Sequence, residues 1–299
     1  HLTKLRKVGY LWVEGVPPFG VKRVPKHFAG SENAVTSQSV IVERNRLEND
    51  LLHVRVEGDG TLTVSDKRTG QKYPGLMEFR LQPDQGDSYN SAPIPGQPGV
   101  KLEFRGCQHC EGSGGLRGQI VLNYSYTEEK GGYALSYGFT TTLSLSAGSD
   151  LLEFETVFVN QCMPQHKLQV AFPTGKPIEA VTAESHLGIV SRAYDPAYRP
   201  QSHMPVEKMK ELQSNTGPIQ RFISANGQSW ITEGLTEYEV YQQTLFITLL
   251  RSFQALSKAD TGVRGAQAGP PLVTPEGNCL NRQMVCRYAW THTSPEPER

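Results

Sequence analysis

Two stretches of this sequence, both containing glycine and proline, gather side chains that could bind a ligand. The first, residues 84–93 (DQGDSYNSAP), contains Asp87 and Tyr89. The second, residues 248–279, begins in an apolar run and carries several charged side chains: Arg251, Lys258, Asp260, Arg264 and Glu276. A long loop inside a compact domain is either functional or disordered, and apolar runs with regular turns flank the second stretch. We therefore expect structured loops that position functional side chains.

Two arginines could serve either a ligand or the fold. A guanidinium offers five donors in a fixed fork, which suits hydroxyl groups as well as a buried carboxylate. Arg251 follows a strongly apolar run, and a buried arginine without a partner would be destabilising. We therefore expect Arg251 to be structural and neutralised by one of three acidic residues: Glu237, Asp260 or Glu276. Arg192 is compatible with either role, and Asp260 with Arg264 is expected to brace the second loop.

Cys107 and Cys110 form a Cys-x2-Cys pattern, which is half of a zinc site. A closed tetrahedral site needs two further ligands, and the candidates lack the paired spacing that would strengthen the pattern: Cys162, His166, His186, Cys279 and Cys286. The pair lies in residues 106–115, which we predict to be a hairpin tip. The sequence therefore favours two reduced thiols on a loop over a metal site or a redox-active pair.

Composition restricts the classes of function. A globule of 299 residues buries about three-quarters of its unfolded surface, so one large domain or two are possible. Basic and acidic residues each total 30, so the sequence lacks the basic excess of a nucleic-acid-binding protein. No apolar stretch approaches the ~20 residues of a membrane span, so we expect no membrane partner. Five cysteines, without disulfide-like spacing, favour a reducing, cytoplasmic location.

Most of the sequence is predicted to form strands. Residues 51–56 and 61–65 alternate apolar and polar side chains around Asp59-Gly60, which is the pattern of a β-hairpin. Strand character recurs in further segments: 120–126, 133–145, 151–160, 221–225, 228–232, 244–250 and 284–290. The single helical candidate is residues 206–213. The predicted fold is therefore all-β, a large antiparallel β-sandwich of two stacked sheets with few or no helices.

The start of the chain differs in composition from the rest, as at a domain edge. Prolines punctuate residues 16–25, and residues 30–39 are mostly small and polar. We assign residues 1–40 to the tail of a preceding small β domain plus a connector. Residues 41–299 are assigned to the sandwich.

Several motifs resemble, in the same order, the C-terminal region of the α-mannosidases of glycoside hydrolase family 38. Residues 16–20 look like the exit from the family's small β domain, and residues 47–70 look like its first sandwich strands. Residues 234–238 (GLTEY) and the two loop stretches complete the resemblance. One motif departs from the pattern, because Gln165-His166-Lys167 stands where the family has Asp-His-Arg. The resemblance covers essentially the whole chain and implies the large sandwich that the family shares with sugar mutarotases.

The resemblance also implies which parts do the chemistry. In this family the zinc ligands and the aspartate nucleophile lie in an N-terminal α/β barrel, which would precede His1. No catalytic residue and no metal ligand is therefore assigned here. The chain would be the non-catalytic C-terminal portion of a retaining, zinc-dependent α-mannosidase, with the barrel and a mannoside as partners. In the intact enzyme Asp87, Tyr89 and Arg192 would contribute to the sugar pocket, and three residues would hold the second loop: Arg251, Asp260 and Arg264.

Two alternatives stay open. A stand-alone carbohydrate-binding module should present several exposed aromatic side chains in one groove, whereas the three tryptophans of this sequence do not cluster. A mutarotase-like isomerase would transfer protons through a histidine and a glutamate, and Glu184 and His186 share one side of a predicted strand. The residues around them match the mannosidase pattern better. Surface meant for a missing domain could also promote a homo-oligomer.

Overall fold

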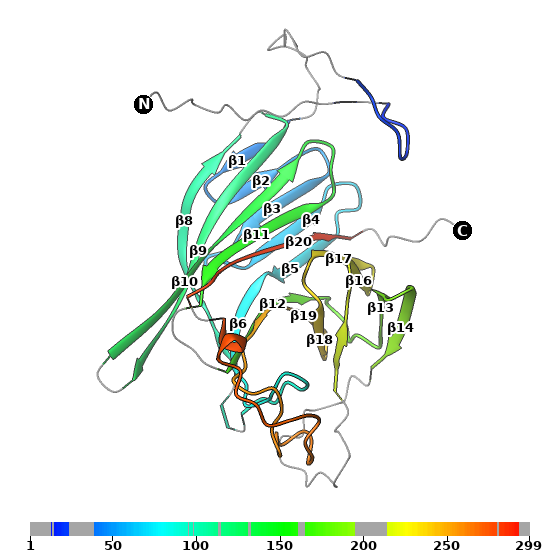
Figure 1. Cartoon of the computed structure of the whole chain (residues 1–299). Coiled ribbons are helices and arrows are strands. Elements are labelled where there is room, and N and C mark those ends of the chain that lie inside the picture. The colour runs from blue at the N-terminus through cyan, green and yellow to red at the C-terminus, as the bar shows by residue number, and fades with distance from the viewer. Residues whose placement is uncertain are drawn as a thin grey trace.

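The chain folds almost entirely into strands. The computed structural model describes the following residues: 13, 15–23, 39–94, 96–97, 99–112, 115–130, 133–160, 165–194, 214–279 and 281–292. Within them twenty strands form three antiparallel sheets, and the only helical element is a 3-10 turn, η1 (Pro275–Asn278) (Figure 1). The all-β prediction is confirmed, whereas the helical candidate at 206–213 lies outside the described residues. In the described part of the chain, no helix has the length and apolarity to cross a membrane.

The first sheet is a five-stranded meander. Its strands follow chain order: β1 (Ile41–Glu43), β2 (Arg46–Glu48), β3 (Leu52–Val56), β4 (Leu62–Asp66) and β5 (Lys72–Leu76). The predicted Asp-Gly turn joins β3 to β4, with Asp59 Oδ1 accepting the Thr61 N–H at 3.0 Å and Gly60 at a φ of +82°. Asn49 Oδ1 accepts the Leu52 N–H at 2.7 Å at the start of β3. These turns fix the register that sends alternate side chains into the core.

The second sheet has nine strands. Their spatial order is β14 (Gly188–Ala193), β13 (Ala180–Ser185), β16 (Phe222–Ala225), β17 (Gln228–Glu233), β20 (Gln283–Thr291), β11 (Leu152–Val159), β10 (Tyr133–Ser146), β9 (Arg117–Lys130) and β8 (Glu103–Glu111). The meander predicted across residues 120–160 and the hairpin around Asn226-Gly227 are both confirmed. The last strand of the chain, β20, lies between β11 and β17 and joins the two halves of the sheet.

The third sheet has six strands. Their spatial order is β15 (Thr216–Pro218), β18 (Glu237–Tyr241), β19 (Thr244–Arg251), β12 (His166–Pro173), β6 (Glu78–Pro83) and β7 (Val100–Lys101). In β12 Lys167 is only 2% exposed, and its Nζ donates to Glu239 on β18 at 2.6 Å. Burial lowers the pKa of Lys167, but the charge of Glu239 outweighs this effect and holds the pKa above its ordinary value. The position that departs from the family motif therefore supplies a buried ion pair.

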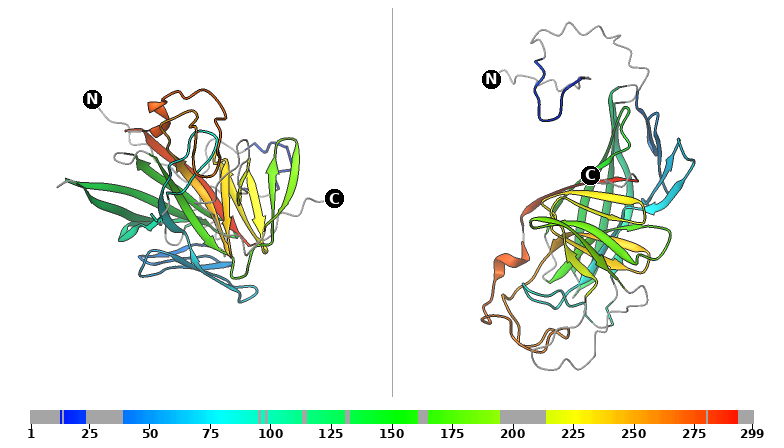
Figure 2. Two further views of the ribbon diagram at one scale, coloured as in Figure 1. Left: turned by 90° about the horizontal axis from the view of Figure 1, so that it is seen from below. Right: turned by 90° about the vertical axis from the view of Figure 1, so that its right-hand side faces the viewer.

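The nine-stranded sheet covers both other sheets with one face (Figures 1 and 2). Phe139 of β10 meets Phe79 of the six-stranded sheet with ring centroids 4.7 Å apart. Trp290 of β20 meets Tyr73 of the five-stranded sheet at 5.0 Å. The predicted second layer is thus divided into two sheets, because Met77, with a φ of +66°, redirects the chain between β5 and β6. Burying each such large side chain contributes about 1.5–3 kcal/mol.

Residues 103–111 form the edge strand β8, so the prediction of a hairpin tip at Cys107 and Cys110 was wrong. The strand pairs with β9 but slips register twice, between Phe104 and Gly106 and between Cys107 and His109. Gly106 takes a φ of +111°. The glycine that suggested a turn instead permits a bulge within a continuous strand.

The assignment of faces can be tested with two truncations. Leu143 on β10 is fully buried, whereas Val285 on β20 is 45% exposed on the opposite face. We expect Leu143→Ala to lower the free energy of unfolding by about 2–5 kcal/mol through lost burial and a cavity. The control, Val285→Ala, should lower it by less than about 1 kcal/mol. Urea unfolding followed by tryptophan fluorescence measures both, and equal losses would contradict the assignment.

Candidate functional site

The two loop stretches singled out in the sequence leave the six-stranded sheet at the same end of its strands. β6 and β19 both pair antiparallel with β12, which lies between them, so they run parallel to each other. Their C-terminal ends therefore lie at the same end of the sheet, on either side of β12. From them emerge loop A (residues 84–93) and loop B (residues 252–274) (Figure 1). The backbone N–H of Ser88 in loop A donates to the carbonyl of Ala255 in loop B at 3.1 Å. The fold thus brings together segments far apart in sequence.

Loops A and B together with Arg251 make up a cluster of polar side chains, the loop cluster, and Asp84 and Arg251 form its first ion pair. Nε of Arg251 donates to Oδ2 of Asp84 at 3.0 Å, and its Nη2 donates to the backbone carbonyls of Asp87 and Asn90. Asp84 is 2% exposed, and its Oδ1 accepts the Gly86 N–H at 2.7 Å. One guanidinium therefore closes loop A on itself.

Asp87 and Arg264 form the second ion pair, with side chains 0% and 5% exposed. Nη2 of Arg264 donates to Oδ2 of Asp87, and Nη1 donates to the side-chain oxygen of Asn90. The same carboxylate accepts the backbone N–H groups of Tyr89 at 3.0 Å and Lys258 at 2.8 Å. Because Asp87 belongs to loop A and Arg264 to loop B, this pair fastens the two loops together.

Both carboxylates are held in the ionised form. Burial raises the pKa of Asp84, but the charge of Arg251 and backbone hydrogen bonds outweigh burial and lower the pKa below its ordinary value. Burial also raises the pKa of Asp87, and the hydrogen bond from Arg264 with those of the backbone again produces a net lowering. A general acid needs a pKa close to the working pH. The two carboxylates are therefore suited to holding the loops rather than to proton transfer.

Two glycines allow the loops to approach so closely. A Cβ added to Gly86 would lie 1.9 Å from the carbonyl oxygen of Asn90. A Cβ added to Gly269 in loop B would lie 2.8 Å from the hydroxyl oxygen of Tyr89. Larger residues at either position would force backbone or ring to move.

Tyr89 is the aromatic side chain that this cluster presents to solvent. It is 52% exposed, and the described residues contain one other exposed aromatic side chain, Phe19. Its backbone N–H is bonded to Asp87, and the guanidinium of Arg264 lies 5.8 Å from its ring centroid. The ring is therefore carried on a fixed backbone while keeping an accessible surface, which suits contact with a partly polar ligand.

Two predicted ion-pair partners were wrong. Arg251 pairs with Asp84 and not with any of the three expected acids: Glu237, Asp260 or Glu276. Arg264 pairs with Asp87, whereas the exposed Asp260 accepts the N–H of the residue two positions further on. The common cause is that β6 and β19 end on the same side of the sheet, so the carboxylates nearest to both arginines come from loop A.

Arg192 lies apart from Asp87 and Tyr89. It is on β14, the edge strand of the nine-stranded sheet, whereas loop A follows β6 of the six-stranded sheet. Its Nη1 donates to the backbone carbonyl of Pro218 at 3.4 Å. The structure thus brings together two of the three residues predicted to contribute to the pocket.

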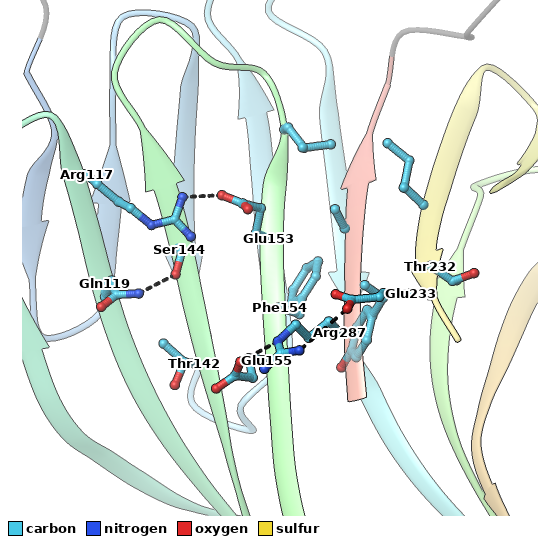
Figure 3. A pocket seen from close by; sticks show the side chains of 14 residues that line it. Arg117, Gln119, Thr142, Ser144, Glu153, Phe154, Glu155, Thr232, Glu233 and Arg287 are labelled. Carbon is cyan, nitrogen blue, oxygen red and sulfur yellow. Dashed lines mark hydrogen bonds and ion pairs between the residues drawn. The ribbon is translucent and has the colours of Figure 1, made fainter. Parts of the chain in front are cut away.

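A groove of about 380 Å³ crosses the outer face of the nine-stranded sheet (Figure 3). Its arginines are neutralised by neighbouring acids, in the pairs Arg117–Glu153, Arg287–Glu155 and Arg287–Glu233. The aromatic residues of its lining, Phe154 and Tyr288, are only 2% and 3% exposed because their rings face the core. The groove therefore does not offer the aromatic platform on which a carbohydrate-binding module would stack a sugar.

Glu184 and His186 lie at the tip of the β13–β14 hairpin. Glu184 accepts hydrogen bonds from Nε of Arg221 at 3.0 and 2.8 Å, and this interaction lowers its pKa. His186 is exposed, with Nε2 3.2 Å from the side-chain nitrogen of Gln220. The carboxylate that a mutarotase-like reaction would use is thus already engaged in an ion pair.

The described residues contain no group of three or more His, Cys, Asp and Glu side chains arranged to hold a metal ion. In the loop cluster, the two buried carboxylates are each bonded to an arginine. What this arrangement can do is present a rigidly mounted tyrosine to a ligand or to a neighbouring domain.

This chain is similar to known proteins in both sequence and fold. The model of the glycosyl hydrolases family 38 C-terminal domain matches residues 47–256. The crystal structure of an α-mannosidase from Enterococcus faecalis V583 is similar, with a TM-score of 0.70 and 23% identity over 86% of this chain and 30% of that chain. A second structure, of a protein in glycosyl hydrolase family 38 from Enterococcus faecalis, gives 0.69 and 22%, over 86% and 31%. No curated protein matches significantly. The chain thus spans about a third of these structures, and the likeness confirms the fold.

Removing one charge from the second ion pair tests its structural role. We expect Asp87→Asn to lower the free energy of unfolding by about 3–5 kcal/mol, because the buried Arg264 loses its countercharge. The matched control is Asp260→Asn in loop B, which alters an exposed side chain and should change stability by less than about 0.5 kcal/mol. Urea unfolding of the three proteins measures the difference. Equal effects of the two substitutions would show that Asp87 is not needed to join the loops.

The lowered pKa values of Asp84 and Asp87 predict a loss of stability in acid. A carboxyl group whose folded pKa lies below the unfolded value, about 3.9, contributes fully above that value. Its contribution is lost as the pH falls through the folded pKa. We therefore expect the stability difference between the unsubstituted protein and Asp87→Asn to be constant from pH 7 to about 5 and to shrink below about 4. Urea unfolding over this range measures it, and a difference independent of pH would contradict the assigned charge state.

Proposed function

This chain belongs to the family of glycosyl hydrolase family 38 C-terminal domains, and from that membership we propose that it is the non-catalytic β-sandwich portion of a retaining, zinc-dependent α-mannosidase. It docks on the catalytic barrel and lends loop A to the pocket for a terminal α-mannoside. The barrel supplies the zinc ion and the nucleophile. The described cysteines are free thiols, which is compatible with the reducing, cytoplasmic location proposed for this enzyme.

The observation that carries this proposal is the exposed Tyr89 on a buried ionic framework. A sugar presents both C–H surfaces and hydroxyl groups, and a tyrosine offers an apolar ring with a polar tip to match them. Because loop A is already fixed by Asp84 and Asp87, little conformational entropy is lost when a ligand is bound. The site is thus suited to orienting a sugar whose bond is broken by groups from the barrel.

The carboxylates of loop A support a non-catalytic role. A retaining glycosidase needs two carboxyl groups about 5–5.5 Å apart on either side of the scissile bond, one of them with a raised pKa. Asp84 and Asp87 are buried, bonded to arginines and lowered in pKa. Asp87 therefore acts on the sugar through Tyr89, as a positioning residue. Arg192 is a second proposed sugar contact, apart from loop A on the exposed edge strand β14. Among the described residues, its bond to Pro218 uses one of the five guanidinium donors.

Substituting Tyr89 in an assembly of this chain with a family 38 catalytic barrel tests the proposal. We expect Tyr89→Ala to lower kcat/KM for an aryl α-mannoside by about 10- to 100-fold, because stacking and one hydrogen bond are lost. Tyr89→Phe should show a smaller loss, and Arg192→Ala tests the second contact. The control is Ile231→Ala, which alters a 40% exposed side chain on the outer sheet face. Unchanged kcat/KM for Tyr89→Ala, with the assembly intact on size-exclusion chromatography, would refute the sugar contact.

The isolated chain provides the complementary control. By itself it should show no measurable hydrolysis of the aryl α-mannoside and little binding of mannose. Sustained turnover that survives Tyr89→Ala and Arg192→Ala but not His186→Ala would overturn the assigned site. Tight mannose binding without the barrel would indicate a stand-alone carbohydrate-binding module, and anomer interconversion followed by polarimetry would indicate an isomerase.

A further inference from the structure

Cys107 and Cys110 lie on the edge strand β8, where a bulge aligns them. In a regular strand, residues three positions apart point to opposite faces of the sheet. Here Cys107 opposes Leu122 of β9 and Cys110 opposes Ile120, so a three-residue step on β8 matches a two-residue step on β9. The bulge absorbs the extra residue. Both thiols therefore lie on the face that Leu122 and Ile120 turn toward the core.

The two sulfur atoms already touch. Their separation is 3.2 Å, and both side chains are partly buried against the core as free thiols. Sγ of Cys110 lies 3.6 Å from the backbone carbonyl oxygen of Glu43 on β1. A disulfide brings two sulfurs to about 2.05 Å, so a displacement of about 1 Å would close this bond. The other described cysteines, Cys279 and Cys286, have no such neighbour in the described part of the chain.

We propose that Cys107 and Cys110 are a redox-sensitive pair that forms a reversible intramolecular disulfide with a low-molecular-weight disulfide such as oxidised glutathione. The thiolate of Cys107 attacks one sulfur of glutathione disulfide and releases one glutathione thiolate, leaving a mixed disulfide. Cys110, as its thiolate, then attacks the sulfur of Cys107 and releases the second glutathione. Two protein thiols are oxidised, one glutathione disulfide is reduced, and the two thiol protons pass to the released glutathiones.

The surroundings of the pair set the order of these steps. Burial and the hydrogen bond with Cys107 raise the pKa of Cys110 to about 11. Since the thiolate is the nucleophile, Cys110 is disfavoured as the first attacking group and Cys107 takes that role. Cys110 acts second, when its target is held in contact and its small thiolate fraction is offset by proximity.

The disulfide would fix the bulge at the edge of the nine-stranded sheet. Edge strands expose unpaired backbone groups and are prone to pair with other chains, and a bulge counteracts this tendency. Because β8 also contacts β1 through Cys110 and Glu43, the bond would stiffen the seam with the five-stranded sheet. Loops A and B emerge from a different sheet, so the pair senses redox conditions independently of the proposed sugar contact.

Oxidation of the purified chain in glutathione buffers tests the pair. With rising oxidised glutathione, we expect the number of free thiols to fall by two, with a loss of two hydrogen atoms in mass and full reversal by dithiothreitol. Peptide mapping should link Cys107 to Cys110. Cys110→Ser should accumulate glutathione on Cys107, whereas Cys107→Ser should collect little. The control, Cys286→Ser, alters a buried thiol outside the pair and should oxidise like the unsubstituted protein.

Other outcomes would refute the proposal. Thiols that stay free in excess oxidised glutathione, stable glutathione adducts on the unsubstituted protein, or a link to another cysteine would each exclude the pair. Retention of zinc by the reduced protein after dialysis, with protection of the same two thiols, would show a metal site instead. If a variant fails to fold by circular dichroism, the mass and peptide map of the unsubstituted protein decide the question alone.

Discussion

The buried pair of Asp87 and Arg264 is the constraint on which the loop cluster depends. Removing both charges from water is unfavourable, and a buried ion pair contributes to stability only when further hydrogen bonds satisfy its remaining groups. That condition is met here, because the carboxylate of Asp87 accepts hydrogen bonds from backbone N–H groups, and Nη1 of Arg264 donates to the side-chain oxygen of Asn90. Few alternative arrangements would satisfy all these groups at once, so the pair specifies the conformation of both loops.

The sheets supply the geometry that this pair requires. β12 separates β6 from β19 and pairs antiparallel with each, so the C-terminal ends of both neighbours lie at the same end of the sheet. The nine-stranded sheet packs on the six-stranded sheet and stabilises it through contacts such as that of Phe139 with Phe79. The four charged groups of the two ion pairs hold the loops, while Tyr89 keeps 52% of its surface exposed. Both carboxylates of this framework are thus suited to fixing the loops rather than to transferring a proton.

Local signals predicted the parts of this fold that are local. The Asp59-Gly60 and Asn226-Gly227 turns, and the alternating strands around them, follow from residues adjacent in sequence. The ion-pair partner of Arg251 could not be predicted from neighbouring residues. Asp84 lies 167 positions away, and only the pairing of β6 and β19 with β12 brings the two residues together. Gly106 was ambiguous for another reason, since a glycine permits a turn and a bulge equally. The available signal for the site was the presence of two aspartates in residues 84–93 and two arginines in residues 248–279, but spacing alone could not show which aspartate pairs with which arginine.

The separation of 177 positions between Asp87 and Arg264 has a consequence for biosynthesis. Loop A leaves the ribosome early, when the arginines that neutralise it have yet to be translated. Its carboxylates must remain hydrated until β19 and loop B are added, because contacts this distant form late in folding. A polypeptide terminated before position 264 would therefore keep Tyr89 but lose both Arg264 and β20, so that neither the second ion pair nor the strand that joins the two halves of the nine-stranded sheet could form.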